Sequence, residues 1–124
     1  MKTQTLKLKI QAFISGAIFL VTSCEELTQT DLTDKQIVLT APVDNLTTTA
    51  TANTFAWDPT NGAAKYQLQI VSPKFDSVVR FVVDSSFSKT TFTYTLTPGQ
   101  YQWRVRASNS GSQTAYFTRT ITIQ

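Results

Sequence analysis

The chain has 124 residues, of which 41% are hydrophobic and 15% charged, and it contains one cysteine and no histidine. It is long enough for one small domain, and without histidine it lacks the base that most hydroxyl and thiol nucleophiles need. The formal charge of +3 does not indicate nucleic-acid binding, because it resides in Lys2, Lys7 and Lys9, and acidic and basic residues balance after residue 23.

The first 23 residues have the pattern of an export signal. The basic residues precede an apolar stretch, 10–21, that matches a signal-peptide core and is too short to cross a bilayer of about 30 Å. It ends in Val21-Thr22-Ser23-Cys24, which resembles the lipobox of bacterial lipoproteins. That resemblance implies that Cys24 is acylated, for example with palmitate, and anchors the protein in a membrane. An ordinary signal peptide with a chance cysteine and an uncleaved anchor are the alternatives.

Two acidic residues, Glu25 and Glu26, follow the cysteine directly. They resemble the export signal of Bacteroidetes-type lipoproteins, which implies lipid anchoring in the outer membrane of the cell envelope with surface exposure. A soluble charged tether on the periplasmic leaflet is the alternative. Residues 24–36 are polar and aperiodic, so we expect a flexible tether that leads into a domain over 37–124.

From residue 37 onwards, short apolar runs alternate with turn residues and predict an all-β domain of seven strands. The expected strands are 37–39, 54–57, 65–71, 78–83, 91–96, 101–107 and 116–123. Asn61-Gly62 and Pro98-Gly99 mark turns, because asparagine and glycine tolerate a positive φ and proline presets its own. Tyr101 follows the second turn closely, so its hydroxyl can bond to the backbone upstream, as in the tyrosine corner of Greek-key sandwiches.

The alternation within these strands also predicts which side chains form the core. The expected core residues are Phe55, Trp57, Tyr66, Leu68, Ile70, Phe81, Phe92, Tyr94, Leu96, Tyr101, Trp103, Val105, Phe117, Ile121 and Ile123. Arg119 falls in phase with Phe117 and Ile121, which conflicts with a buried face. We expect either a bulge in the last strand or a guanidinium that reaches past the sheet edge.

The strand order and several key residues resemble a fibronectin type III domain. Trp57 matches the core tryptophan of the second strand, and Tyr101, Trp103, Val105 and Ala107 match the strand after the Pro-Gly turn. The stretch 57–70 resembles the single-domain versions found in Bacteroidetes lipoproteins. The resemblance covers 37–123 and implies an immunoglobulin-like (fibronectin type III) β-sandwich. It implies little about activity, because this fold serves many unrelated functions.

Polar side chains that could bind a partner lie on two strands that are neighbours in this fold. They are Gln67, Gln69, Gln102, Arg104 and Arg106. Amides and guanidinium groups on one sheet face could bind sugar hydroxyls or acidic groups, although a merely solvated face is the alternative. Tyr116 adds an aromatic ring near a loop tip.

A second candidate is the stretch 78–83, which is apolar on both faces. Its residues Val78, Arg80 and Val82 could form an edge interface that accepts a partner strand. Alternatively, a loop residue such as Phe75 or Phe87 covers this surface.

We predict no catalytic site, cofactor or metal site, because the chain has no metal-ligand spacing and its acidic residues fall mostly in the tether and turns. The expected function is therefore a non-catalytic protein-interaction or adhesion module that docks an envelope protein. A glycan-binding accessory lipoprotein and a spacer without a ligand are the alternatives.

Overall fold

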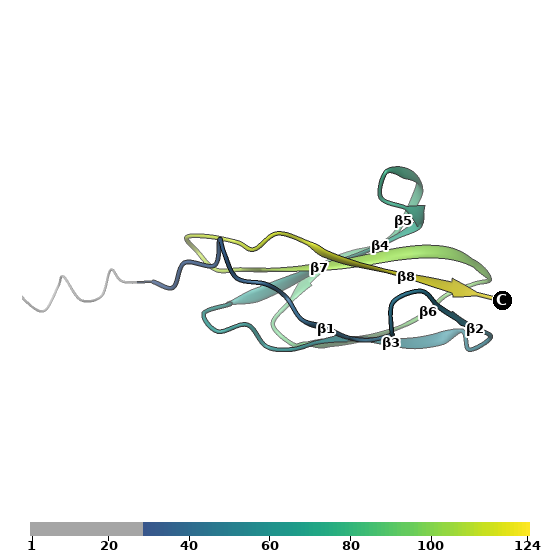
Figure 1. Cartoon of the computed structure of the whole chain (residues 1–124), viewed down its shortest axis with the longest axis horizontal. Coiled ribbons are helices and arrows are strands. Elements are labelled where there is room, and N and C mark those ends of the chain that lie inside the picture. Colours follow the sequence, from purple (N-terminus) through teal and green to yellow (C-terminus); the bar gives the residue numbers. More distant parts are fainter. Residues whose placement is uncertain (1–28) are drawn as a thin grey trace, which may run out of the picture.

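The computed structural model describes residues 29–124, which form eight strands in two packed sheets (Figure 1). The strands are β1 (Leu39–Ala41), β2 (Leu46–Thr48), β3 (Ala52–Trp57), β4 (Lys65–Lys74), β5 (Ser77–Phe87), β6 (Thr91–Thr95), β7 (Gly99–Ser108) and β8 (Phe117–Ile123). Cys24, Glu25 and Glu26 lie outside the described residues. Within residues 29–124, no helix has the length and hydropathy needed to span a membrane.

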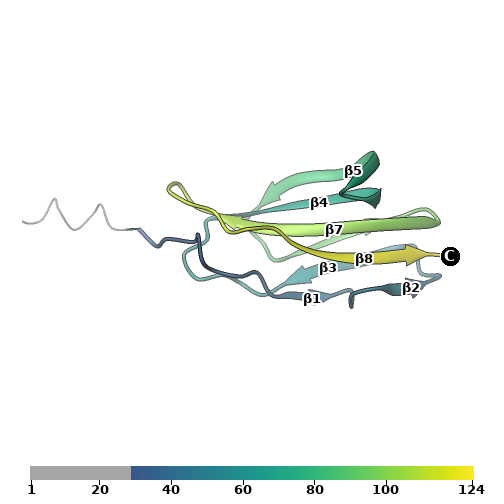
Figure 2. The same cartoon turned by 45° about the horizontal axis from the view of Figure 1, so that its top comes forward.

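The two sheets have the orders β1–β3–β6 and β2–β8–β7–β4–β5. The all-β sandwich expected from the sequence is confirmed, with eight strands instead of seven. The additional strand arises because the chain crosses between the sheets near Pro42: β1 pairs antiparallel with β3, whereas β2 pairs parallel with β8 (Figure 2). Proline lacks the N–H that a continuous ladder needs, which favours the break at this point.

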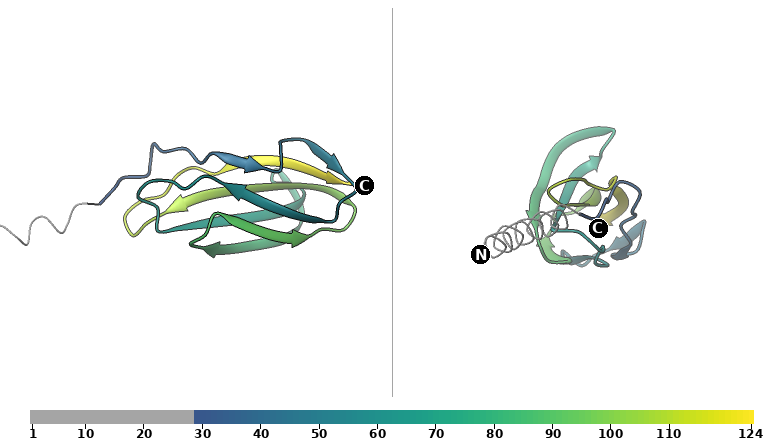
Figure 3. Two further views of the ribbon diagram at one scale, coloured as in Figure 1. Left: turned by 90° about the horizontal axis from the view of Figure 1, so that it is seen from below. Right: turned by 90° about the vertical axis from the view of Figure 1, so that its left-hand side faces the viewer.

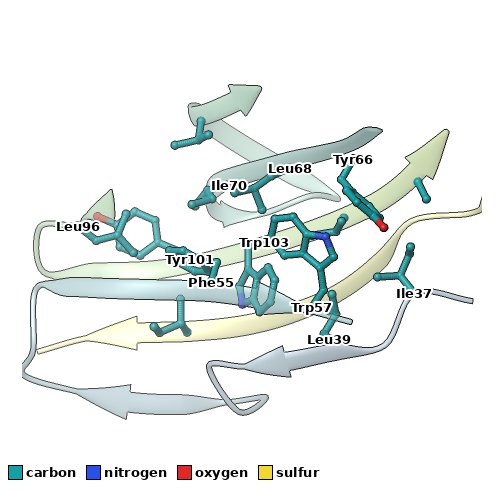
Figure 4. Packing of buried hydrophobic residues seen from close by; sticks show 14 of the residues in the cluster. Ile37, Leu39, Phe55, Trp57, Tyr66, Leu68, Ile70, Leu96, Tyr101 and Trp103 are labelled. Atoms are coloured by element: carbon teal, nitrogen blue, oxygen red, sulfur yellow. The ribbon is translucent and has the colours of Figure 1, made fainter. Parts of the chain in front are cut away.

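Aromatic side chains from both sheets fill the core (Figure 4). Trp103 on β7 is fully buried and meets Phe55 on β3 edge to face, with ring centroids 5.1 Å apart. Trp57 packs in the same manner against Tyr66, at 5.8 Å. These four residues were all expected in the core, because they occupy the apolar phase of their strands. The sandwich is thus held together mainly by large rings that cross the gap between the sheets.

Two of the predicted core residues, Phe92 and Phe117, are only half-buried, and two others are exposed. Phe81 is 54% exposed and Tyr94 is 36% exposed. The pairing of β4 with β5 shifts register between Ile70 and Val71, so Val83 faces the core and Phe81 lies opposite Val71 in the outer row of the sheet. Tyr94 lies on β6, the terminal strand of its sheet, where no further strand covers it.

Tyr101 forms the predicted tyrosine corner. Its hydroxyl donates a hydrogen bond of 2.7 Å to the carbonyl of Thr97. The turn before it is opened by Gly99, whose φ of 151° lies in the region that glycine tolerates best. The ring itself is buried, so the hydroxyl bond satisfies the polar end of a core residue.

Arg119 lies on the inner side of β8 as its phase requires, and the predicted bulge is wrong. The register between β7 and β8 runs without a shift from Gly99 to Val105. The guanidinium instead donates hydrogen bonds to the carbonyls of Leu39, at 2.6 Å, and Pro42, at 2.8 Å. It therefore reaches the edge of the sandwich and satisfies carbonyls where the first strand changes sheets.

The N-terminal segment 29–36, expected to belong to the tether, is attached to the domain at the end opposite the C-terminus (Figures 1 and 3). Leu32 is fully buried in the core, and its N–H donates a hydrogen bond of 2.9 Å to Ser112 Oγ. The Asn109 side chain donates to the carbonyl of Thr30, at 2.8 Å. The packed part of the chain therefore begins before residue 37.

Candidate interaction site

The outer face of the five-stranded sheet brings the five predicted polar residues together. In the register of β4 with β7, Gln67 lies opposite Arg106 and Gln69 lies opposite Arg104. Gln102 lies opposite Val71 in the next row towards the β4–β5 hairpin. Since directly opposed residues of paired strands point to the same side, all five side chains share one face.

The glutamine amides on this face are occupied within the protein, whereas Arg106 has no hydrogen bond within residues 29–124 and contacts the Tyr116 ring. Asp84 on β5 accepts hydrogen bonds from the side-chain amides of Gln67 and, at 3.2 Å, Gln69. Arg104 Nε donates to Gln69 Oε1 at 2.8 Å. Gln102 Oε1 accepts from the backbone N–H of Phe75 at 2.9 Å. A ligand that used the glutamine amides would have to displace these bonds.

Two aromatic rings cover the middle of the same face. The Arg104 guanidinium lies 3.9 Å from the centroid of the Phe75 ring and 4.1 Å from that of Tyr116. Arg106 also lies over Tyr116, at 4.7 Å. Tyr116 is therefore held over β7 by stacking, rather than presented from a loop tip. Local sequence patterns do not reveal Asp84 and Phe75 as members of this face, because their partners lie 17 and 27 residues away along the chain.

The predicted edge interface on β5 remains open. β5 is the terminal strand of its sheet and pairs only with β4. Val79 is 82% exposed and Val78 is 38% exposed, in addition to the exposed Phe81 described above. Of the three predicted interface residues, Val78 and Arg80 are exposed, whereas Val82 packs against the core.

Neither residue expected to cover this edge does so. Phe75 stacks on Arg104, as described above, and Phe87 turns inwards between Trp57 and Phe92, with centroids 6.2 and 5.2 Å away. The stack continues from Phe92 to Tyr94 at 5.9 Å. An aromatic series thus runs from the core to the open side of the sandwich, between the edges of β5 and β6.

A small pocket of about 130 Å³ lies between these two edges. It is lined by Arg80, Val82, Tyr94, Thr95, Leu96, Thr97 and Tyr101. Its walls combine apolar and hydroxyl groups with one cation, Arg80. Within residues 29–124, no group of three or more acidic or cysteine side chains has the arrangement of a metal site.

Comparisons with known proteins agree with this architecture. Among solved structures, the fibronectin(III)-like modules of Clostridium thermocellum CbhA align with a TM-score of 0.52 and 11% identity, over 72% of this chain and 96% of that one. A structure described as FN3tt mut aligns with a TM-score of 0.50 and 19% identity, over 71% of this chain and 90% of that one. The domain has the fibronectin type III fold.

No protein-family model and no curated protein sequence matches the chain. The fibronectin type III fold alone does not define a function, because it is reused for unrelated tasks. Any function must therefore be argued from the surfaces of this particular domain. Its outer face is partly covered by internal bonds and stacking, whereas β5 presents apolar side chains and one strand edge that pairs with no other strand of the described residues.

Proposed function

We propose that this protein is a lipid-anchored, non-catalytic interaction module of a bacterial cell envelope, and that it binds an envelope protein through the edge of β5. The lipobox-like sequence ending at Cys24 supports the anchor, and Glu25 and Glu26 support an outer-membrane location with surface exposure. Acylation also gives a use to the one cysteine of an exported chain.

A non-catalytic role is supported by the residues available for chemistry. The chain has no histidine, and its cysteine is assigned to the lipid in this proposal. The acidic side chains are dispersed: Asp84 accepts hydrogen bonds from glutamines, Asp31 from Thr33, and Asp44 from the backbone N–H of Thr120. Hydrogen bonds from the hydroxyl and backbone N–H of Thr33 hold the pKa of Asp31 below its ordinary value, so this exposed group is not a proton donor near neutral pH.

The observation that carries the proposal is the combination of a free strand edge with large exposed apolar side chains. Backbone N–H and C=O groups along such an edge can pair with a strand from another chain. Val79 and Phe81 would lose water on pairing, which favours association by about 25 cal/mol for each Å² of apolar surface buried. On the outer face the glutamine amides are already bonded within the protein, which leaves fewer groups for a glycan, so protein binding is the better-supported function.

The anchor can be tested by growing the source bacterium with an alkyne-tagged palmitate analogue. We expect the tag on the wild-type protein and its loss in a Cys24→Ala variant, which should leave the membrane fraction. An untagged wild-type protein would contradict lipidation.

The interaction can be tested with a photo-cross-linking residue placed at Val79 in intact cells. Val43 provides the matched control, because it is an apolar residue 61% exposed elsewhere on the domain. We expect a discrete cross-linked protein from position 79 that is absent from position 43. A cross-linker at Ser77 should capture the same protein, and this product should be lost when Val79→Lys and Phe81→Lys are added. Equal products from positions 79 and 43, or none from either, would contradict the proposal and favour a spacer.

A further inference from the structure

We infer that the β5 edge selects an extended, largely apolar segment that presents a carboxylate side chain to Arg80. This inference rests on the function proposed above and adds the chemistry of the partner. It follows from the two sides of the β5 edge, which differ in charge.

One side of β5 faces the pocket, and the other side belongs to the outer face of the five-stranded sheet. Arg80 and Val82 line the pocket between β5 and β6, together with Tyr94 and Leu96. Phe81 pairs with Val71 and Val78 pairs with Pro73, so both lie in the outer row of the sheet, and Val79 falls at the register shift between Arg80 and Val78. A strand added beside Arg80 and Phe81 would therefore place one side chain over the pocket and its neighbour beside Phe81 on the outer face.

The pocket side carries a cation that the described residues leave unpaired. The Arg80 guanidinium has no hydrogen bond or ion pair within residues 29–124. The nearest acidic residues along β5 and its hairpin are engaged elsewhere: Asp84 accepts from two glutamines on the outer face, and Asp76 lies 4.0 Å from Lys74 Nζ. A carboxylate placed over the pocket would thus meet Arg80 without competition.

The surroundings of Arg80 favour this pairing further. Tyr94 and Leu96 form part of the same pocket, and a bound strand would exclude water from it. A guanidinium can bind a carboxylate through two parallel hydrogen bonds, and a drier site strengthens their attraction. The partner is therefore expected to carry glutamate or aspartate at a position facing the pocket, flanked by apolar residues that face outwards.

A second copy of this chain fits the same edge poorly. Antiparallel pairing of two β5 strands centred on residue 80 would place the two Arg80 side chains directly opposite each other. Like charges that face each other across paired strands are destabilising. The same arginine that attracts an acidic segment therefore opposes self-association in this register, and charges on edge strands commonly serve this purpose.

The inference can be tested with three synthetic peptides of seven residues, acetylated and amidated at their ends, in which valine and threonine alternate around a central residue. The central residue is glutamate, glutamine or lysine. The affinities of these peptides for the ¹⁵N-labelled full chain are measured by NMR titration, and the signals of residues 29–124 are followed. We expect the glutamate peptide to bind about fivefold more tightly than the lysine peptide, with shifts concentrated in β5 and β6.

Variants then identify the source of the preference. Arg80→Gln should reduce it to less than about twofold, and Arg80→Glu should reverse it, because the lysine peptide then meets an opposite charge. Arg106→Gln is the matched control, since it removes a cation from the outer face and should leave the preference unchanged. Val79→Lys combined with Phe81→Lys should weaken all three peptides.

Results that overturn the selection of a carboxylate can be distinguished from results that overturn the β5 interface itself. Equal affinities for the three peptides, or no binding by any of them, would overturn the selection of a carboxylate, whereas a cross-linked partner at position 79 would still support the β5 interface. A dimer of the protein alone, detected by sedimentation and lost in the Val79→Lys variant, would also overturn the inference, because the occupant would then be a second copy.

Discussion

The contribution of the tyrosine corner to stability can be tested by removing the hydroxyl group of Tyr101. In Tyr101→Phe the carbonyl of Thr97 loses its 2.7 Å hydrogen bond, while the ring and its packing remain. We expect the free energy of unfolding to fall by about 1 kcal/mol, measured by urea denaturation. Tyr94→Phe is the matched control, because the Tyr94 hydroxyl has no hydrogen bond within the described residues, and it should change stability by less than about 0.5 kcal/mol. Equal effects of the two variants would contradict a stabilising role for the corner.

At this scale the sequence predicted best where a strand alternates without interruption. Tyr101, Trp103 and Val105 are buried as expected, because β7 pairs on both sides and keeps one face to the core. Phe81 and Tyr94 were predicted wrongly, because a register shift and a sheet edge depend on partner strands that a local pattern does not contain.

Arg119 binds the chain where it passes from one sheet to the other. Replacing it by methionine keeps the apolar stem but leaves the carbonyls of Leu39 and Pro42 without their donor. We expect a loss of about 1–3 kcal/mol in the free energy of unfolding, because polar groups are then left unsatisfied at the point where β1 gives way to β2. Arg119→Lys should lose less, since an ammonium group can still reach one carbonyl. An unchanged urea midpoint for the methionine variant would show that water replaces the guanidinium at no cost.

The sequence located the conflict at Arg119 but not its solution. A cation on an apolar phase is visible from two neighbouring residues, whereas the carbonyls that it binds lie 77 and 80 residues away along the chain. The same limitation affects the candidate site. Alternation placed Gln69 and Arg104 on one face, but it could not reveal that Asp84, Phe75 and Tyr116 complete the network and close it.

For the molecule as a whole, the segment 29–36 contributes to the stability of the fold as well as linking the domain to the residues before it. Leu32 is fully buried, so Leu32→Ala should cost about 2–5 kcal/mol, a large part of the 5–15 kcal/mol typical of a small domain. Thermal unfolding followed by circular dichroism provides the measurement. Val38→Ala, at an exposed apolar position nearby in sequence, should have little effect. If the two variants melted together, the segment before residue 37 would be dispensable for folding.

The attachment of Leu32 beside Ser112 also has a geometric consequence for a chain acylated at Cys24. In such a chain the eight residues from Glu25 to Leu32 can span at most about 28 Å. The end of the sandwich that holds Leu32 would therefore lie within that distance of the lipidated cysteine. The exposed valines of β5 follow the far end of β4, away from the pole where Ser108 pairs with Lys65. In a chain anchored in this way, the exposed valines of β5 would lie at the end of the sandwich remote from the tether, where other proteins could reach them.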